Sequence, residues 1–560
     1  MFRLANRRSR KPYHLLSTVH RRRLEKLEIS ARNEYEHLQQ QNIDIANANP
    51  IARANSDFVD EDEIFAECSQ TEEDEIFVSS NALANDIQFA FNNEALNSSD
   101  VAESVSDYNN MVDIEPQNTI DNFQEHLAEV FIRSNIYHTQ INGVLQVLRT
   151  HSCLSTLPKD CRTLLKIPRI ANPTLNIAGG EYLHLGVEAE ILSILQQTTP
   201  ELIPLDTLMI DFSTDGATLD RQSNIQMWPI QIRIANISRS KPEIVGVWRG
   251  SSKPTNAKEL FQCFVDEVRD ILNRGVVFYN QLKSIKLRRF IADSPARVFI
   301  LGHKGHGSIF PCSKCWIRGN WLRRGVIAYR GIQHRLRTDE EYRHRIDGEH
   351  HSDFDSGLLP LEMGLVTQTI FDYMHIVCLG VVPKINSVFV DGKYNRNLKL
   401  SARSLEIMTI HLQQIKNYCP KEFSRKPQLM KKYSGFKATE NRQLLLYTAP
   451  VIYYGLINPA AYKHFLLLHS AIRVLVSSFL SEDRLDFAHT ALSIFVNRAE
   501  DIYGPEFLSY VTHCLLHLID NVRRFGSLNE LSMFPYENNM TYFRNACCKP
   551  HQHLQQIVNR

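Results

Sequence analysis

Residues 256–293 have the sequence NAKELFQCFVDEVRDILNRGVVFYNQLKSIKLRRFIAD, and this stretch carries a clear structural signal. Its first half places apolar residues three and four positions apart, which is the spacing of one face of an α-helix. Asn256 stands where a helix-capping residue is preferred. The pattern predicts an amphipathic helix over 256–276, followed by a strand over 285–292. The apolar positions of the helix are Leu260, Phe261, Phe264, Val265, Val268, Ile271 and Leu272.

Three shorter segments upstream of this helix have the composition of β-strands. Each is rich in β-branched and aromatic residues, and Gly, Asn and Ser separate them, as is common between strands. They cover 208–215, 228–234 and 242–248. Strand, strand, strand, helix, strand is the element order of a ribonuclease-H-like core, in which the helix crosses over to a parallel strand. We therefore expect an α+β or α/β fold built on such a core.

Helical and low-complexity segments surround this predicted core. Amphipathic stretches near 401–418, 440–456, 461–480 and 484–502 predict a large all-helical insertion. The expected organisation is a basic segment over 1–30, an acidic, Asn- and Ser-rich disordered region over 31–120, a helical region that is a candidate for DNA binding over 121–200, the core with its C-x-x-C turn over 201–360, the helical insertion over 361–510, and the C-terminal part of the core over 511–560.

The composition excludes several classes of protein. The chain has 560 residues, of which 43% are hydrophobic, so it can bury at least one large core. No run approaches about 18 apolar residues and the N-terminus lacks an apolar signal region, so we expect neither a membrane span nor a secretory signal. The 11 cysteines are scattered and odd in number, which favours a reducing compartment over a disulfide framework.

Charge is segregated along the chain although the net charge is only +1. Residues 1–30 carry nine Lys or Arg against two Glu, and residues 56–115 carry seventeen Asp or Glu with no Lys or Arg. The remainder of the chain is therefore basic, which indicates a polyanionic partner such as nucleic acid. The basic runs at 7–11 and 21–23 are typical of nuclear import or phosphate contact, so we expect a nuclear protein.

Two aspartates occupy the ends of predicted strands. Asp215 ends the first strand, just before Gly216, and Asp293 follows the fourth, just before a Ser-Pro turn. In a ribonuclease-H-like core, carboxylates at such positions converge on two divalent cations that hold the attacking and leaving oxygens of a phosphodiester. Asp is also common after strands because it favours turns, so the residues alone leave both interpretations open.

Several ordered motifs from about residue 120 to the end of the chain resemble those of the CACTA-like transposases, and most of all the animal transposase-domain proteins of that group. The resemblance implies a DDE-type catalytic triad of Asp215, Asp293 and Glu537 that binds Mg²⁺ or Mn²⁺. It also implies cleavage and strand transfer of double-stranded DNA, in DNA transposition, by a homo-oligomer. The motifs are the region around Asp215 and residues 290–297, 302–315, 371–380, 436–440, 513–518 and 534–538.

The resemblance also assigns a role to four side chains that can bind a metal. Cys312 and Cys315 form a C-x-x-C pair, and His513 and His517 stand four residues apart. In the wider group of DDE recombinases, a C-x-x-C and two histidines in these relative places share one zinc ion, which implies a closed Cys2His2 site here. On the residues alone, a local site that uses His306 is an alternative. Other histidines near the C-x-x-C are His303, His334, His350 and His351.

Two further motifs match the same group. Asp372 stands three residues before His375, and on a helix this spacing puts both on one face, where the carboxylate can orient the ring or both can approach a phosphate or metal. The alternative is a hydrogen-bonded pair that joins the helical insertion to the core. Lys437 and Arg442 are candidate DNA contacts.

The chain departs from the pattern of the group after its first aspartate and at its end. Gly216 is followed by Ala-Thr-Leu-Asp rather than by a Leu-Pro-Leu-like run, which makes Asp211 a rival for the first catalytic position. The chain also ends where relatives continue, so a catalytically decayed, domesticated transposase that acts as a DNA-binding protein is the alternative function. A zinc hydrolase built on His350, His351 and Asp353 is a third hypothesis, but no H-E-x-x-H-like spacing supports it.

Overall fold

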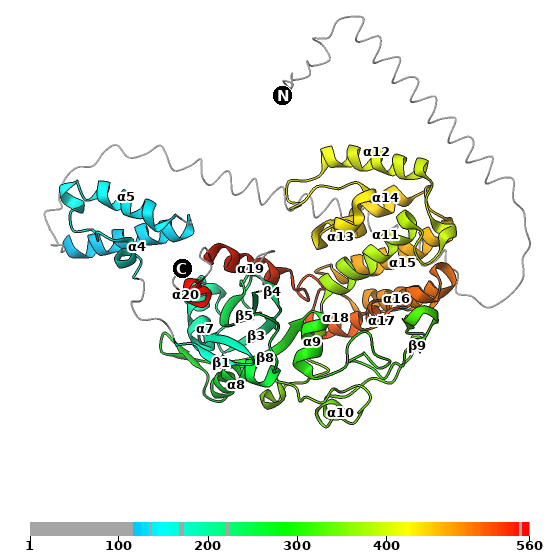
Figure 1. The fold of residues 1–560 in the computed structure, drawn as a ribbon, viewed down its shortest axis with the longest axis horizontal. Coiled ribbons are helices and arrows are strands. Elements are labelled where there is room, and N and C mark those ends of the chain that lie inside the picture. The colour runs from blue at the N-terminus through cyan, green and yellow to red at the C-terminus, as the bar shows by residue number, and fades with distance from the viewer. Residues whose placement is uncertain (1–115, 135, 167–172, 220–224, 548–550, 559–560) are drawn as a thin grey trace, which may run out of the picture. The chain divides into compact units, whose positions relative to one another are not determined.

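The structure is a computed structural model, and it describes residues 116–134, 136–166, 173–219, 225–547 and 551–558. The basic segment over 1–30 and nearly all of the acidic region over 31–120 lie outside the described residues. Within the described residues the protein has a mixed α and β architecture, with one large mixed sheet and many helices (Figure 1).

A nine-stranded sheet contains both parallel and antiparallel pairs. Its strand order is β1-β2-β6-β5-β3-β8-β11, with β4 beside β5 and β7 beside β8. β3 pairs antiparallel with β5 and parallel with β8, and β8 pairs parallel with β11. The strands are β1 (Leu175–Ile177), β2 (Gly180–His184), β3 (Thr207–Thr214), β4 (Ala217–Thr218), β5 (Gln226–Ile234), β6 (Glu243–Gly250), β7 (Val276–Phe278), β8 (Gln281–Ala292) and β11 (Thr369–Phe371).

The four predicted strands and the helix between them correspond to β3, β5, β6, α8 and β8. The helix α8 (Ala257–Arg274) begins directly after Asn256 and ends two residues earlier than predicted, because Gly275 at φ +74° turns the chain. A Cβ atom at this glycine would lie 2.7 Å from the carbonyl oxygen of Lys283, so the turn excludes larger residues. β7 and β8 then form a hairpin, so the fourth strand begins at Gln281 rather than at Ile285.

The cap of α8 gives a prediction about stability. The side-chain oxygen of Asn256 accepts hydrogen bonds from the backbone N–H groups of Lys258 (2.9 Å) and Glu259 (3.3 Å). Asn256→Ala removes this acceptor and is expected to lower the free energy of unfolding by about 1 kcal/mol, whereas Asn256→Asp keeps it. Equilibrium denaturation of the wild type and the two variants measures the difference, and an alanine variant as stable as the wild type would contradict it.

Helices cover both faces of the sheet, which is why the central strands are buried along most of their length. α7 (Val187–Gln196) and α8 share a hydrophobic core with Phe212, Ile232 and Phe290 from the strands. α19 (Phe534–Ala546) and α20 (His553–Val558) contribute Met540 and Leu554 to a separate cluster with other strand residues. Met227 and Trp228 are neighbours on β5 but belong to the two different clusters, so the clusters lie on opposite faces of the sheet. A sheet buried on both faces leaves the strand ends as its accessible edge.

Between β11 and α19 the described chain is helical, as the amphipathic stretches predict. The helix predicted over 440–456 is broken into three pieces, and the middle piece has the wider π-helical winding. Pro450 at the start of the third piece has no N–H to donate, which favours a break there. The elements are η6 (Met374–Val381), α11 (Val382–Asp391), α12 (Ala402–Tyr418), η8 (Met430–Gly435), α13 (Ala438–Gln443), η9 (Leu444–Thr448), α14 (Ala449–Tyr453), α15 (Pro459–Leu475), α16 (Glu482–Tyr503), α17 (Tyr510–Cys514), η11 (Leu515–His517) and α18 (Leu518–Phe525).

The remaining described elements are α4, which has 18 residues, and shorter helices and strands. α4, α5 and α6 bury a small core of their own around Ile141, Leu145 and Leu164, in the region predicted to be helical. The segment between β8 and β11 holds two helices and a two-stranded sheet. The bounds are α4 (Pro116–Arg133), α5 (His138–Leu148), α6 (Cys161–Leu164), α9 (Ser294–Leu301), β9 (Asn320–Trp321), β10 (Ile327–Ala328) and α10 (Asp339–Arg343).

One stretch of the helical region, Met374–Asp391, is long and apolar enough by composition alone to cross a membrane. It corresponds to η6 and α11, and 61% of it is buried inside the fold. Val377, Val381, Ile385 and Phe389 belong to the hydrophobic core of the helical region. Packing within the protein therefore accounts for the apolar character of this stretch.

Candidate active site and metal centre

Asp215 and Asp293 follow the ends of two neighbouring parallel strands. Ser213 of β3 pairs with Ile291 of β8, so each aspartate stands two residues beyond one member of this pair. The Gly216 N–H donates a 2.7 Å hydrogen bond to Oδ1 of Asp215. Asp293 is the N-cap of α9 and accepts a 2.7 Å hydrogen bond from the backbone N–H of Ala296. Backbone hydrogen bonds therefore restrain both carboxylates at the same edge of the sheet.

A third parallel strand adds Asp372 to this edge. Phe371 of β11 pairs with Ala292 of β8, which places Asp372 beside Asp293 in the register. The Asp372 side chain is 1% exposed and lies 2.6 Å from Nδ1 of His375 through its Oδ2 atom. Its Oδ1 atom accepts a 2.7 Å hydrogen bond from the backbone N–H of Met533, directly before α19. The contacts of Asp372 therefore match both roles proposed from the sequence, which are orientation of the His375 ring and joining of the helical insertion to the core.

Glu537 lies beside His375, although it belongs to the C-terminal part of the chain. It lies in the first turn of α19, and its Oε1 atom is 3.3 Å from Nε2 of His375. The helix is held on the sheet by Asn539, whose Nδ2 atom donates to the side chain of Gln231 at 2.9 Å. His375 thus links Asp372 to Glu537, and this link is an unforeseen feature of the site. We call Asp215, Asp293 and Glu537 the carboxylate cluster.

The pKa values show that the cluster concentrates negative charge. The pKa of Asp215 is raised to about 7, first by burial and then by the charge of Asp293, with a further contribution from Glu537. The pKa of Glu537 is also raised, by burial first and then by Asp372 and Asp293, while His375 opposes the shift. Asp215 and Asp293 are half-buried and Glu537 is exposed, and carboxylate oxygens are the ligands that hard divalent cations prefer. The three residues thus offer oxygen ligands, although the one metal-binding group found among the described residues consists of Cys312, Cys315, His513 and His517.

His375 is held in its charged form by the carboxylates around it. Burial alone would lower its pKa, but the hydrogen bond to Asp372 and the charges of Asp372, Glu537 and Asp293 raise it to about 9. The protonated imidazole donates to Asp372 through Nδ1 and forms an ion pair with Glu537 on its Nε2 side. The ring therefore fixes the position of the Glu537 carboxylate.

Asp211 lies away from the carboxylate cluster and has other partners. Its register neighbours are Arg233 on β5 and Arg289 on β8, and its Oδ2 atom lies 3.1 Å and 2.7 Å from their guanidinium groups. Asp211 and Arg289 are fully buried. A buried carboxylate paired with arginines is a structural ion pair, and this pairing favours Asp215 as the first carboxylate of the site.

The same arginines hold the loop that leads to α19. Arg289 donates to the carbonyl oxygen of Glu530 at 2.9 Å, and Arg288 donates to the carbonyl oxygen of Phe525 at 2.6 Å. These contacts fasten the chain between α18 and α19 to the sheet. The ion pair of Asp211 therefore contributes to the position of Glu537 without touching it.

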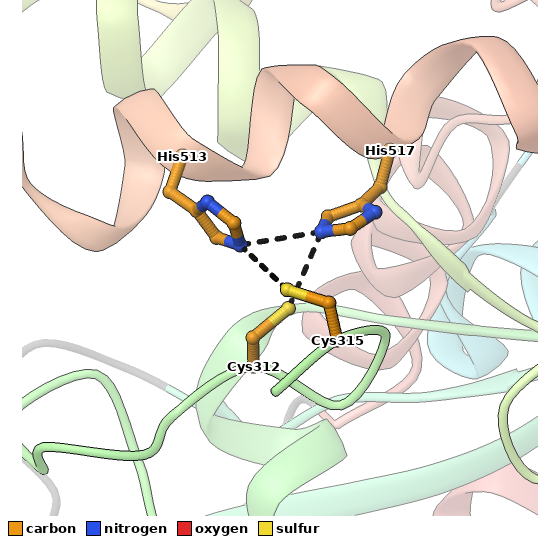
Figure 2. A group of neighbouring side chains, drawn as sticks. All are labelled: Cys312, Cys315, His513 and His517. Atoms are coloured by element: carbon orange, nitrogen blue, oxygen red, sulfur yellow. Dashed lines mark hydrogen bonds between the residues drawn. The ribbon is translucent and has the colours of Figure 1, made fainter. Parts of the chain in front are cut away.

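Cys312, Cys315, His513 and His517 come together in the interior. All four are buried, and one ligand atom from each lies within 4.8 Å of all the others. Figure 2 shows the two cysteines of the turn facing the two histidines of the helical segment. The Nε2 atom of His517 is 3.5 Å from Sγ of Cys312, the Nε2 atom of His513 is 3.3 Å from Sγ of Cys315, and the two Nε2 atoms are 3.2 Å apart. This group can hold a tetrahedral metal ion such as zinc.

The electrostatics of this group favour a thiolate. Burial alone would raise the pKa of the Cys312 thiol, but the hydrogen bond with Cys315 and the two histidines lower it well below its usual value. The pKa of Cys315 is raised by that same hydrogen bond and by burial, because one proton is shared between the two sulfur atoms. A cation at this point would remove the shared proton and stabilise both thiolates, as zinc does in Cys2His2 sites.

The other proposed metal ligands do not join this group. His306 is exposed on the surface and is absent from the metal-binding group found among the described residues. His350 and His351 are buried, whereas Asp353 is exposed, and no metal-binding group among the described residues contains them. The geometry therefore favours the long-range Cys2His2 site over the local alternative.

Lys437 and Arg442 lie at the two ends of α13. Lys437 is exposed at the N-cap position, with its backbone N–H bonded to Oε2 of Glu440 at 2.7 Å. Arg442 is half-buried and donates to the side chain of Asn529 at 2.9 Å. Arg442 therefore has a structural partner, and DNA contact by either residue stays a prediction.

No protein-family model matches the chain, and no curated protein matches it. The interpretation of both sites therefore rests on their residues and geometry.

Proposed function

We propose that the protein is a DNA transposase, or is derived from one, and that it cleaves and joins DNA strands with a DDE triad of Asp215, Asp293 and Glu537. The observation that carries this proposal is the carboxylate cluster itself, which combines two strand ends and a helix that are far apart in sequence. The strand order and directions around β3, with a helix crossing to parallel β8, support a ribonuclease-H-like core.

The proposed reaction consists of two displacements at phosphorus. Water attacks a phosphodiester, a new P–O bond forms, and the bond to the 3′ oxygen breaks to leave a free 3′-hydroxyl. That hydroxyl then attacks a phosphodiester of the target DNA, so one P–O bond forms as another breaks. Two bound Mg²⁺ ions would lower the pKa of the attacking group and stabilise the leaving oxygen.

The protein residues would bind and orient in this reaction. The carboxylates of Asp215 and Asp293 are restrained by backbone N–H groups, so they are held in place for cation binding. His375, held by Asp372, orients Glu537 as the third ligand. Preorganised ligands lower the free energy needed to assemble the site when DNA and cations bind.

We propose a structural role for zinc bound by Cys312, Cys315, His513 and His517. The two histidines lie in the segment that continues through α18 to Glu537, and the two cysteines lie on the turn after Asp293. A closed Cys2His2 site has no open position for a substrate, so its contribution is to folding. It would lock the segment that carries the third carboxylate against the segment that carries the second.

Cleavage of supercoiled plasmid DNA tests the proposed function. The intact chain is expected to nick the plasmid in Mg²⁺ or Mn²⁺ and not in their absence. A duplex oligonucleotide with a free 3′-hydroxyl should become joined to the plasmid in the same reaction. Salt-sensitive binding of duplex DNA without any cutting would favour the alternative, a domesticated transposase that acts as a DNA-binding protein. The observation that supports this alternative is that the residues after Gly216 differ from the pattern of the CACTA-like transposases.

The location and assembly of the protein belong to the same proposal. A DNA transposase works on chromosomal DNA, so we propose a nuclear protein that acts as a homo-oligomer on transposon ends and target.

The raised pKa of Asp215 gives a prediction about pH. A carboxyl with a pKa of about 7 must lose its proton before it can bind a cation, so protons and Mn²⁺ compete below that pH. Because half of the carboxyl groups are already protonated at pH 7, the dissociation constant for Mn²⁺ is expected to rise by about fivefold between pH 7 and pH 6. Titration calorimetry or Mn²⁺ resonance spectra can measure this, and an affinity that does not change with pH would contradict it.

A further inference from the structure

The segment that joins α12 to α13 is strongly basic. Residues 421–437, called here the basic segment, contain six Lys or Arg and one Glu. All six basic side chains are exposed, and none has an ion pair among the described residues. The six residues are Lys421, Arg425, Lys426, Lys431, Lys432 and Lys437.

Several arginines elsewhere on the described surface pair with carboxylates. Arg330 pairs with Glu500 at 2.6 Å, and Arg274 pairs with Glu188 at 2.5 Å. In the basic segment, repulsion between neighbouring charges has no such compensation within the described protein. A polyanion that binds there would relieve this repulsion and release the ions condensed on its own surface.

The basic segment is anchored by buried residues between its charged ones. Met430 is fully buried and Phe436 is 9% exposed, and both belong to the core of the helical region. Tyr433 donates its hydroxyl to the carboxylate of Asp391 at the end of α11. Because these anchors alternate with exposed lysines, the charges project from a fixed backbone, and little ordering is needed on binding.

The basic segment leads to the carboxylate cluster. Lys437 is the N-cap of α13, and α13 packs against η6, which carries His375. From α13, Arg442 bonds to Asn529 in the loop that precedes α19 and Glu537. α13 and the contact of Arg442 thus connect the basic segment to the segments that carry His375 and Glu537.

We propose that the basic segment binds the phosphate backbone of the duplex DNA on which the carboxylate cluster acts. The choice of duplex DNA as the polyanion rests on the proposed function. Lysine and arginine contacts to phosphates do not distinguish bases, so this surface supplies affinity and orientation rather than sequence choice. Each phosphate contact adds about 0.9 to the slope of log affinity against log salt concentration.

The test compares two variants of the full chain that lose the same charge. In the first, four residues of the basic segment are replaced: Arg425→Gln, Lys426→Gln, Lys431→Gln and Lys432→Gln. In the control, four exposed residues near β5, β6 and α8 are replaced: Arg239→Gln, Lys241→Gln, Lys253→Gln and Lys258→Gln. Affinity for a duplex of about 40 base pairs and arbitrary sequence is measured without Mg²⁺ over a range of salt concentrations. Unfolding midpoints and metal content establish that both variants are folded.

We expect the basic-segment variant to bind the duplex on the order of 10 to 100 times more weakly than the wild type at about 0.15 M salt. The slope of its log affinity against log salt concentration should be smaller in magnitude by about 2 to 4, whereas the control variant should have the affinity and slope of the wild type. Equal losses in both variants, or no loss in either, would overturn the proposal. A variant that loses binding to single-stranded RNA while it keeps duplex DNA would overturn it too.

Failure of the proposed function has a different outcome from failure of this surface. If the wild type binds duplex DNA through the basic segment but never nicks plasmid DNA in Mg²⁺, the proposed nuclease activity is refuted and the proposed DNA-binding surface is retained. If the wild type nicks plasmid DNA but the basic-segment variant binds duplex DNA with the same salt dependence as the wild type, the proposed DNA-binding surface is refuted and the proposed nuclease activity is retained.

Discussion

Asp293→Asn is expected to abolish Mg²⁺-dependent nicking of plasmid DNA, with a rate at least on the order of 10³-fold lower than that of the wild type. Asp293 lies close enough to Asp215 for its charge to raise the pKa of that carboxyl. Loss of one cation ligand removes several kcal/mol of charge stabilisation, and about 4 kcal/mol corresponds to three powers of ten in rate. The initial rate of nicking at saturating Mg²⁺ measures the effect.

Replacing Asp293 with asparagine tests its role as a cation ligand separately from its role as a helix cap. Asp293 also caps α9 through the N–H of Ala296, and Asn caps a helix as well as Asp does, so the unfolding midpoint should not fall. Asp160 caps α6 in the same way, through the N–H of Arg162 at 2.7 Å. Asp160→Asn is therefore the matched control and should cut DNA like the wild type. Nicking that survives in the Asp293→Asn variant would remove Asp293 from the triad.

Cys312→Ser is expected to lose bound zinc and to destabilise the protein by about 3 kcal/mol or more. The serine oxygen is a poor substitute for the thiolate in a buried site, where His517 lies 3.5 Å from Sγ. The compact unit spans Tyr108–Arg560, and for a unit of this size such a loss would lower the unfolding midpoint by about 3 °C. Metal analysis of the purified protein and a thermal scan measure both effects. DNA cleavage should fall only as far as the fold does.

Cys514→Ser is the control for this prediction. Cys514 is 1% exposed and directly follows His513, but it is not a member of the metal-binding group. Its replacement should leave the zinc content unchanged. His306→Ala should also keep zinc, because the long-range site does not use that residue. Full zinc content in a variant with both His513→Ala and His517→Ala would show that another ligand completes the site.

Local sequence was sufficient to predict the longer elements of the fold. α8 and β8 follow from the spacing of apolar residues in 256–293, because one buried face repeats every 3.6 residues in a helix and every second residue in a strand. The strands β1, β2, β7 and β11 were not predicted. Each has three to five residues, and their positions depend on pairing with strands that are distant in sequence. A segment of that length carries too little periodicity to be distinguished from a loop.

The choice between Asp211 and Asp215 also could not be made from local sequence. The two residues are four positions apart, so both have the same parity in the strand predicted over 208–215 and the alternation of faces cannot separate them. The register separates them, because it places Arg233 and Arg289 opposite Asp211 and places Asp215 beyond the end of the strand. Which residues stand opposite is a property of three paired strands, and no single strand contains that information.

The sequence by itself determined the kinds of ligand and their local spacing. It showed two aspartates after strands, a C-x-x-C turn, and two histidines four residues apart. Only the tertiary structure decided which of these meet, including the contact of His375 with Glu537 and that of Cys312 with His517. The physical reason is that helix and strand periods are set by neighbours along the chain. The approach of residues far apart along the chain is set by sheet pairing and by the burial of the helical core.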